Sequence, residues 1–220
     1  MIDNQSAMFP YIYLASQSPR RQELLKQIGV KYEMLAPEPG EDTESIEASH
    51  PNEKARDYVA RVTLAKSVIA LNRHIERALP WAPILCADTT VSLPGHSGGE
   101  ILGKPFDTVD ADRILKLLSG KTHQVLTAIA LRISPDSEPV SVVQISEVAF
   151  TQLSEDQITK YIASGEAFGK AGAYGIQGLA SAFIESITGS YSGIMGLPLA
   201  ETSQLLNLAQ VAYPLSTSHE

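Results

Sequence analysis

The chain has 220 residues, enough for one large domain or two small lobes. Its 17 basic and 25 acidic residues give a formal net charge of −8, and a composition of 44% hydrophobic and 19% charged residues excludes a wholly disordered chain. An acidic chain lacks the broad basic face that nucleic-acid binding requires, so no nucleic-acid partner is expected. No apolar run reaches the roughly 18 residues of a membrane span, so no membrane association is expected either.

Cysteine content and the N-terminal residues bear on the compartment. Cys86 is the only cysteine, which excludes an internal disulfide framework and a multi-cysteine zinc site. The first ten residues show neither the basic start nor the apolar core of a signal peptide. The expected location is the cytoplasm.

Strand-like and helix-like segments alternate along the chain, which predicts an α/β fold with a mixed central sheet flanked by helices. We expect an N-terminal extension over 1–10, a single domain over 11–211 and a polar tail over 212–220. The predicted strands cover 11–15, 30–36, 83–93, 122–133, 139–150 and 182–187, with a Gly-rich hairpin over 94–100. The predicted helices start at 18, 51, 107, 154 and about 199, and the first, second, third and last of them end near 28, 77, 118 and 209. An acidic loop spans 38–47 and a Gly-rich segment spans 165–178.

The turn after the first predicted strand has the features of a phosphate site. Ser18 is a good N-cap, and Arg20 and Arg21 then fall in the first helical turn, where the helix dipole is already positive and disfavours cations. Free backbone N–H groups beside two arginines would cradle a phosphate. The alternative is two surface arginines paired with Glu23 or Glu44.

Two charged residues interrupt apolar patterns. Lys66 shares a helix face with Val59 and Val62, so its ammonium either reaches the surface or meets an anion in a cleft. Asp88 follows four apolar residues, and an unpaired carboxylate there would be costly to bury. Asp88 therefore needs a metal, a cation or a hydrogen-bonded pocket, and α/β folds place catalytic groups near the ends of strands such as the one predicted over 83–93. The structural alternative for Asp88 is capping a turn.

Further candidates are weaker. Lys104 precedes a proline that stiffens its loop, and Lys170 and Gln177 lie in the Gly-rich segment, where a backbone can approach a ligand closely. Each could instead belong to an ordinary loop. The spacings of a P-loop and of a dinucleotide-binding fold are both missing.

Histidines and the acidic loop carry little chemical signal. The five histidines show no metal-ligand spacing, and His123 is expected to be structural. Cys86 is expected to be a small buried hydrophobe. Within the acidic loop, Asp42, Glu44 and Glu47 are interpreted as solvated, and Glu38 or Glu41 could reach a metal.

Six motifs follow one another along the chain: LASQSPRRQELL (14–25), ADTTV (87–91), LGKP (102–105), LSGKTH (118–123), KAGAYGIQG (170–178) and GLP (196–198). In this order they resemble the motifs of the Maf family of nucleotide pyrophosphatases, first described as septum-formation inhibitors. The matches run from about residue 11 to 205. The resemblance implies a two-lobed α/β fold with a cleft, like that of the inosine-triphosphate pyrophosphatases, and a homodimer.

The implied reaction converts a nucleoside triphosphate to the monophosphate and pyrophosphate with a divalent cation, Mg²⁺ or Mn²⁺. Asp88 matches the family's catalytic acidic residue and is the one metal ligand we would name. The positions that match the substrate cleft are Ser16, Arg20, Arg21, Lys66, Lys104 and Gln177, with Lys170 in the same motif.

Within the family, the chain resembles the dTTP/UTP subgroup more than the subgroup acting on 7-methyl-GTP. Arg21, Thr89 and Gln177 match the positions that mark this specificity, and we expect Thr89 and Gln177 to contact the pyrimidine. Two segments depart from the family pattern. The connection over 94–100 is longer than the usual connection before the GKP motif, and the segment over 191–195 matches only loosely the family's segment before GLP.

Two other functions stay open at this point. One is a nucleotide-binding regulator of cell division that acts through a partner without turnover. The other is a nucleotidyltransferase, although that class expects a Gly-rich loop directly after the first strand, where this chain has Ser16, Gln17 and Ser18.

Overall fold

The computed structural model describes residues 9–38, 41, 45–94 and 100–216. Most of the predicted N-terminal extension, the middle of the predicted hairpin over 94–100 and the end of the polar tail lie outside these residues. So do Asp42 and Glu44 of the acidic loop.

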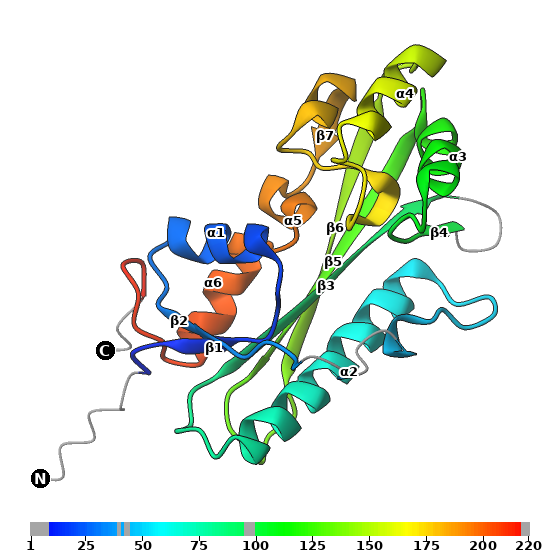
Figure 1. Ribbon diagram of the computed structural model, residues 1–220. Coiled ribbons are helices and arrows are strands. Elements are labelled where there is room, and N and C mark those ends of the chain that lie inside the picture. The colour runs from blue at the N-terminus through cyan, green and yellow to red at the C-terminus, as the bar shows by residue number, and fades with distance from the viewer. Residues whose placement is uncertain (1–8, 39–40, 42–44, 95–99, 217–220) are drawn as a thin grey trace, which may run out of the picture.

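The described strands form one seven-stranded mixed sheet in the order β2-β1-β3-β5-β6-β7, with β4 beside β3 (Figure 1). The strands are β1 Ile12–Leu14, β2 Tyr32–Met34, β3 Ile84–Leu93, β4 Glu100–Leu102, β5 Thr122–Arg132, β6 Val140–Phe150 and β7 Ile184–Thr188. Strand β1 runs parallel to β2 and β3, whereas the pairings of β3 with β4 and β5, of β5 with β6 and of β6 with β7 are antiparallel. The predicted mixed α/β sheet is confirmed.

The described helices begin at or next to the predicted start for the segments from 18, 107, 154 and about 199, but the segment predicted from 51 becomes helical only at Ala55. They are α1 Pro19–Gln27, α2 Ala55–Glu76, α3 Thr108–Leu118, α4 Glu155–Ala163, α5 Tyr191–Met195 and α6 Leu199–Leu208, with 3₁₀ turns η1 Ser45–Glu47, η2 Ala171–Ala173 and η3 Leu179–Phe183. The side chain of Asp107 accepts from the N–H of Asp110 at the start of α3, and Ser154 and Gln157 form a capping box on α4. No helix in the described part of the chain is both long and apolar enough to cross a membrane.

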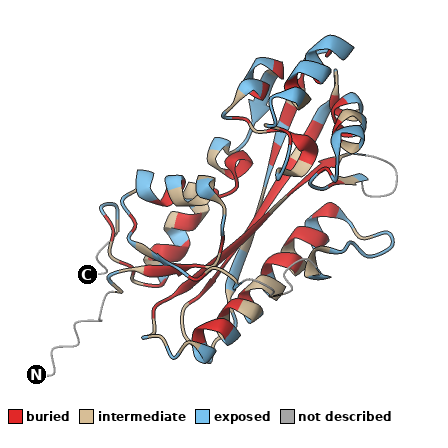
Figure 2. Cartoon of the chain, in the orientation of Figure 1, coloured by how far each residue is buried: buried red, intermediate tan, exposed pale blue. Residues whose placement is uncertain are grey.

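The long strands β3, β5 and β6 connect two ends of the molecule (Figure 1). Helices α1 and α6 gather with β1 and β2 at one end, and α3, α4 and β7 gather at the other. Helix α2 packs along one face of the long strands, and Figure 2 shows its sheet-facing side buried. These two groups of elements correspond to the two lobes that the resemblance implied.

Side chains of β3 alternate between two cores, as the twofold period of a strand requires. Ile84 and Cys86 pack with Ala70 of α2, whereas Leu85 and Ala87 join the large core on the opposite face. Asp88 and Thr89 continue this alternation, so Asp88 faces α2 and Thr89 faces the helices on the other side.

One edge of β3 is only partly covered. Strand β1 pairs with Ile84 and Leu85, and β4 pairs with Val91 through Leu93. Between these pairings, no strand among the described residues covers the edge. Asp88 lies in the middle of β3, as the strand predicted over 83–93 implied, and the neighbouring strand β1 ends beside it.

Several short elements were not predicted. Strand β4, turn η1 and helix α5 have three to five residues each, too few to show a periodic pattern. The strand predicted over 30–36 shortens to β2, and the one predicted over 182–187 starts at Ile184 because η3 occupies its first residues.

Candidate active site

A cleft of about 400 Å³ opens at the uncovered edge of β3. It is bounded by the loop between β1 and α1, turn η1, helix α2, the segment over 169–177 and the end of α5. Every site residue predicted from the sequence lines it: Ser16, Arg20, Arg21, Lys66, Asp88, Thr89, Lys104, Lys170 and Gln177. The structure therefore gathers positions up to 161 residues apart in the sequence into one cleft.

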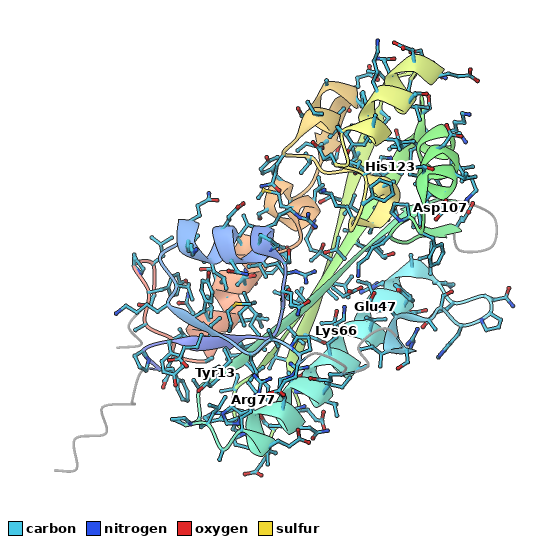
Figure 3. The ribbon with its side chains drawn as sticks, in the orientation of Figure 1. Tyr13, Glu47, Lys66, Arg77, Asp107 and His123 are labelled. Atoms are coloured by element: carbon cyan, nitrogen blue, oxygen red, sulfur yellow. The ribbon has the colours of Figure 1, made fainter. Side chains whose placement is uncertain are left out.

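Opposite charges alternate along the α2 side of the cleft. The ammonium of Lys66 donates to Asp88 Oδ1 at 2.6 Å and to Glu47 Oε1 at 2.7 Å. Lys104 donates to the other oxygen of Glu47 at 3.2 Å. Figure 3 shows Glu47 and Lys66 together beside α2. Lys66 is thus the shared partner of two carboxylates rather than a snorkelling surface residue.

Glu47 is the site residue that sequence reasoning missed. It was interpreted as part of a solvated loop, yet its carboxylate lines the cleft between two lysines. Burial alone would raise the pKa of this carboxyl, but Lys66 and Lys104 outweigh burial and hold the pKa below its usual value. Glu47 is therefore a carboxylate at neutral pH. Its only sequence signal was its place in an acidic loop directly before a helix that carries a lysine on its inner face.

Arg61 of α2 holds the turn that carries Glu47. Its guanidinium donates to the carbonyls of Ile46 at 3.1 Å and Ala48 at 2.9 Å, and it forms an ion pair with Glu53. Tyr58 of the same helix donates to the carbonyl of Glu47 at 2.8 Å. Because these bonds fix the backbone on both sides of Glu47, the carboxylate has a defined position.

The two arginines of α1 contact the end of α5. Arg20 donates from Nε to the carbonyl of Met195 at 3.2 Å, and Arg21 donates from Nε to that of Gly196 at 2.8 Å. Burial lowers the pKa of both guanidinium groups, and Asp88 opposes this effect on Arg21. The surface alternative, with Glu23 as partner, is replaced by this backbone anchoring.

Arg21 also orders two hydroxyls. Its NH1 donates to Ser16 Oγ at 2.9 Å and its NH2 donates to Thr89 Oγ1 at 3.3 Å. Ser18 occupies the N-cap of α1, but its side chain makes no capping hydrogen bond. The loop after β1 therefore places Arg21 between Ser16 and β3.

The remaining candidates lie at the rim and the far wall. Gln177 is exposed, and the side chain of Lys104 is 57% exposed. The ammonium of Lys170 donates to the carbonyl of Glu166, and burial followed by the neighbouring Arg20 lowers its pKa. These groups can shift toward a ligand without leaving a buried partner unsatisfied.

His123 and Cys86 are structural, as expected. Both are buried: His123 bonds to Tyr174 at 2.8 Å and packs against Phe150, and burial lowers its pKa to about 4. Burial raises the pKa of the Cys86 thiol to about 12, so it is protonated at neutral pH.

The donor set suits a cation that is shared with a phosphate. Asp88 and Glu47 supply two carboxylates on one wall, both within 2.7 Å of Lys66. Within the described residues, no group of three or more His, Cys, Asp or Glu side chains could hold a metal by itself. Mg²⁺ in phosphate-processing sites is bound by one or two carboxylates and completes its shell with water and phosphate oxygens. The residues present fit that mode.

Comparison of the sequence with known proteins shows the family to which the chain belongs. Residues 11–209 match the family described as Maf-like protein. A dTTP/UTP pyrophosphatase of Ralstonia nicotianae is 53% identical over 94% of this chain and 97% of its own length. Proteins of the same name from Cupriavidus pinatubonensis and Burkholderia pseudomallei are 53% and 49% identical, over 94% and 97% of this chain and all of their own length. The chain belongs to the Maf family.

Proposed function

We propose that this protein hydrolyses dTTP and UTP to the nucleoside monophosphate and pyrophosphate. One observation carries the proposal: the carboxylate of Asp88, joined through Lys66 to that of Glu47, lies in a cleft whose other charged groups are cations. The names of relatives that are about half identical over nearly the full chain support the same reaction. A cleft for anion binding alone would gain nothing from a central carboxylate.

The cations account for phosphate binding. Arg20 and Arg21 flank the N-terminus of α1, whose unpaired N–H groups attract anions, and Lys104 and Lys170 face them from other segments. A guanidinium can donate hydrogen bonds to two phosphate oxygens at once, whereas the flexible side chain of a lysine lets its ammonium adjust to the position of a phosphate. These four side chains are proposed to hold the triphosphate.

Asp88 is proposed as the general base. It takes a proton from a water molecule while that water's oxygen bonds to the α-phosphorus, and the bond from the α-phosphorus to the bridging oxygen breaks to release pyrophosphate. Lys66 fixes the carboxylate through the 2.6 Å hydrogen bond. Glu47 holds Lys66 from its other side, which keeps the ammonium from moving to the phosphates.

A divalent cation, Mg²⁺ or Mn²⁺, is proposed as the cofactor, with Asp88 and Glu47 as its protein ligands. When bound, it would neutralise charge on the phosphate oxygens. Lys66 would then have to give up part of its contact with both carboxylates, so the cation and the ammonium compete for the same oxygens.

Thr89 and Gln177 are proposed to contact the pyrimidine. Thr89 lies beside Arg21 on the face of β3 opposite to Asp88, and Gln177 lies across the cleft. An amide and a hydroxyl can both form hydrogen bonds with a base edge. A base held there leaves the phosphates free to lie along the arginines toward Asp88.

A homodimer in the cytoplasm completes the proposal. Leu64, Val68 and Ile75 form an exposed apolar stripe on the outward face of α2, which is the kind of surface that a second copy would cover. We expect light scattering to give twice the chain mass and Val68→Lys to give the chain mass. A monomeric wild-type protein would contradict the dimer without affecting the proposed reaction.

Product analysis tests the proposed function. The purified chain is incubated with UTP, dTTP, CTP, ATP and GTP in the presence of Mg²⁺ or Mn²⁺, and the products are separated by chromatography. The proposal expects UMP and dTMP with equimolar pyrophosphate. Formation of UDP and phosphate would contradict it. Tight nucleotide binding without turnover would favour a regulator.

A further inference from the structure

We propose that Thr127 is a positioning residue that makes Thr89 a hydrogen-bond acceptor, and so selects bases whose N3 atom carries a hydrogen. The inference rests on the proposed function, because it concerns which pyrimidine triphosphate the same cleft prefers. Uracil and thymine carry a hydrogen on N3, whereas N3 of cytosine is an acceptor. Thr127 itself does not line the cleft.

The two threonines are direct partners across the antiparallel strands β3 and β5. Partners in such a pair project to the same face of the sheet, here the face covered by α5. Their hydroxyl oxygens are 2.9 Å apart, and Thr127 is fully buried. Thr127 also lies 2.8 Å from the carbonyl oxygen of Gly193 in α5 and donates to it.

Counting protons fixes the direction of these bonds. A hydroxyl has one proton, and a carbonyl oxygen can only accept. The proton of Thr127 is therefore committed to Gly193. The contact between the two hydroxyls then has to use the proton of Thr89. Thr127 consequently takes away the only proton that Thr89 could offer to a ligand.

Arg21 uses one of the two lone pairs on the hydroxyl oxygen of Thr89. A guanidinium only donates, and Arg21 NH2 lies 3.3 Å from Thr89 Oγ1. The Thr89 hydroxyl donates its proton to Thr127 and accepts from Arg21 with one lone pair. One lone pair of Thr89 Oγ1 therefore remains for a ligand. Thr89 lines the cleft and is half-buried, so a ligand can reach it. The atom that meets it has to be a donor.

The hydroxyl of Ser16, which also contacts Arg21, is left as a hydrogen-bond donor rather than an acceptor. Its oxygen accepts from Arg21 NH1 at 2.9 Å and from the backbone N–H of Ser18 at 3.2 Å. Both lone pairs are thus used and its proton remains, so Ser16 donates to a ligand. The two hydroxyls flanking Arg21 therefore present one donor and one acceptor, a pattern set by their hydrogen-bond partners within the protein.

This pattern discriminates between pyrimidines. An N3–H at Thr89 forms a hydrogen bond, whereas the N3 lone pair of cytosine would face another lone pair and lose its bond to water without replacement. Replacing Thr127 by valine keeps the shape but removes both of its hydrogen-bonding functions. Thr89 then regains a free proton and can rotate to donate to cytosine or accept from uracil.

The test compares kcat/KM for UTP and CTP in wild type, Thr127→Val and Thr127→Ser, with monophosphate and pyrophosphate quantified. Thr202→Val is the matched control, because Thr202 is fully buried and donates to the carbonyl of Pro198 on α6. We expect kcat/KM of the wild type to be at least about tenfold higher for UTP than for CTP. In Thr127→Val we expect this ratio to fall about tenfold, mainly because the KM values change. Thr127→Ser and Thr202→Val are expected to keep the wild-type ratio.

Several outcomes separate this inference from the proposed function. No turnover of UTP or dTTP by wild type overturns both. Turnover with an unchanged UTP to CTP ratio in Thr127→Val, or an equal loss in Thr202→Val, overturns the role of Thr127 alone. Should Thr127→Val not fold, Thr89→Val removes the acceptor itself, and a full wild-type ratio in that variant overturns the inference.

Discussion

The ammonium of Lys66 lies 2.6 Å from Oδ1 of Asp88, although the two residues come from a helix and a strand. The contact arises because even-numbered residues of β3 face α2, and Lys66 lies on the inner side of that helix. Lys66 also binds Glu47, so one ammonium links two carboxylates, and an incoming cation has to compete with this ammonium for their oxygens.

Asp88→Asn is expected to lower kcat by at least about 100-fold, because an amide cannot take a proton from water. Nucleotide binding should survive, since the cations of the cleft are unchanged. Turnover and equilibrium binding of UTP are measured side by side. Turnover like that of wild type would remove Asp88 from the role of base.

Glu47→Gln is expected to raise the Mg²⁺ concentration required for half-maximal activity by about tenfold or more, because the variant loses one of two carboxylate ligands. The control is Glu185→Gln, on an exposed strand position of β7. Metal titrations of the initial rate with saturating UTP provide the measurement. An unchanged titration midpoint in Glu47→Gln would leave Asp88 as the only protein ligand.

Gln177→Ala is expected to weaken the preference among bases more than it alters the response to metal, because the Gln177 amide lines the cleft as a proposed contact of the base and not as a metal ligand. The loss of one hydrogen bond corresponds to about 1 kcal/mol, or roughly fivefold in relative kcat/KM. Competition between UTP and GTP in one reaction measures it. The same preference in variant and wild type would count against base contact by Gln177.

His123 predicts a pH dependence of folding stability. Burial lowers its pKa to about 4, from 6.5 for an unperturbed histidine, so the unfolded chain binds more protons between these values. The contribution of neutral His123 to the free energy of unfolding is fully present above about pH 6.5. It is lost as the pH is lowered toward 4, which lowers the free energy of unfolding by about 3 kcal/mol.

Urea unfolding at several pH values between 7 and 4.5 measures this slope. His123→Gln should flatten it, whereas His50→Gln, which alters an exposed side chain, should keep it. Parallel slopes in wild type and His123→Gln would show that other groups dominate the acid response.

Local sequence patterns were sufficient to predict the layout of the fold. Periodicity and caps give the long elements, and the turn chemistry around Ser18, Asp107 and Ser154 places three helix starts. The motifs around Ser16, Asp88 and Lys104 also gather at one cleft, as the resemblance implied.

Contacts between segments far apart in the sequence were not predictable. The 3₁₀ turn that carries Glu47 is set by Arg61 and Tyr58 of α2, and nothing in the acidic loop itself indicates these partners. The arginine anchors at Met195 and Gly196 likewise depend on a five-residue helix that is too short to show periodicity.

Turnover of UTP in water enriched in ¹⁸O tests the central claim most directly. Attack of water on the α-phosphorus predicts one ¹⁸O atom in UMP and none in the pyrophosphate that leaves, as measured by mass spectrometry. Label in pyrophosphate, or in inorganic phosphate released with UDP, would contradict the account, because water would then attack a phosphorus other than the one assigned to Asp88.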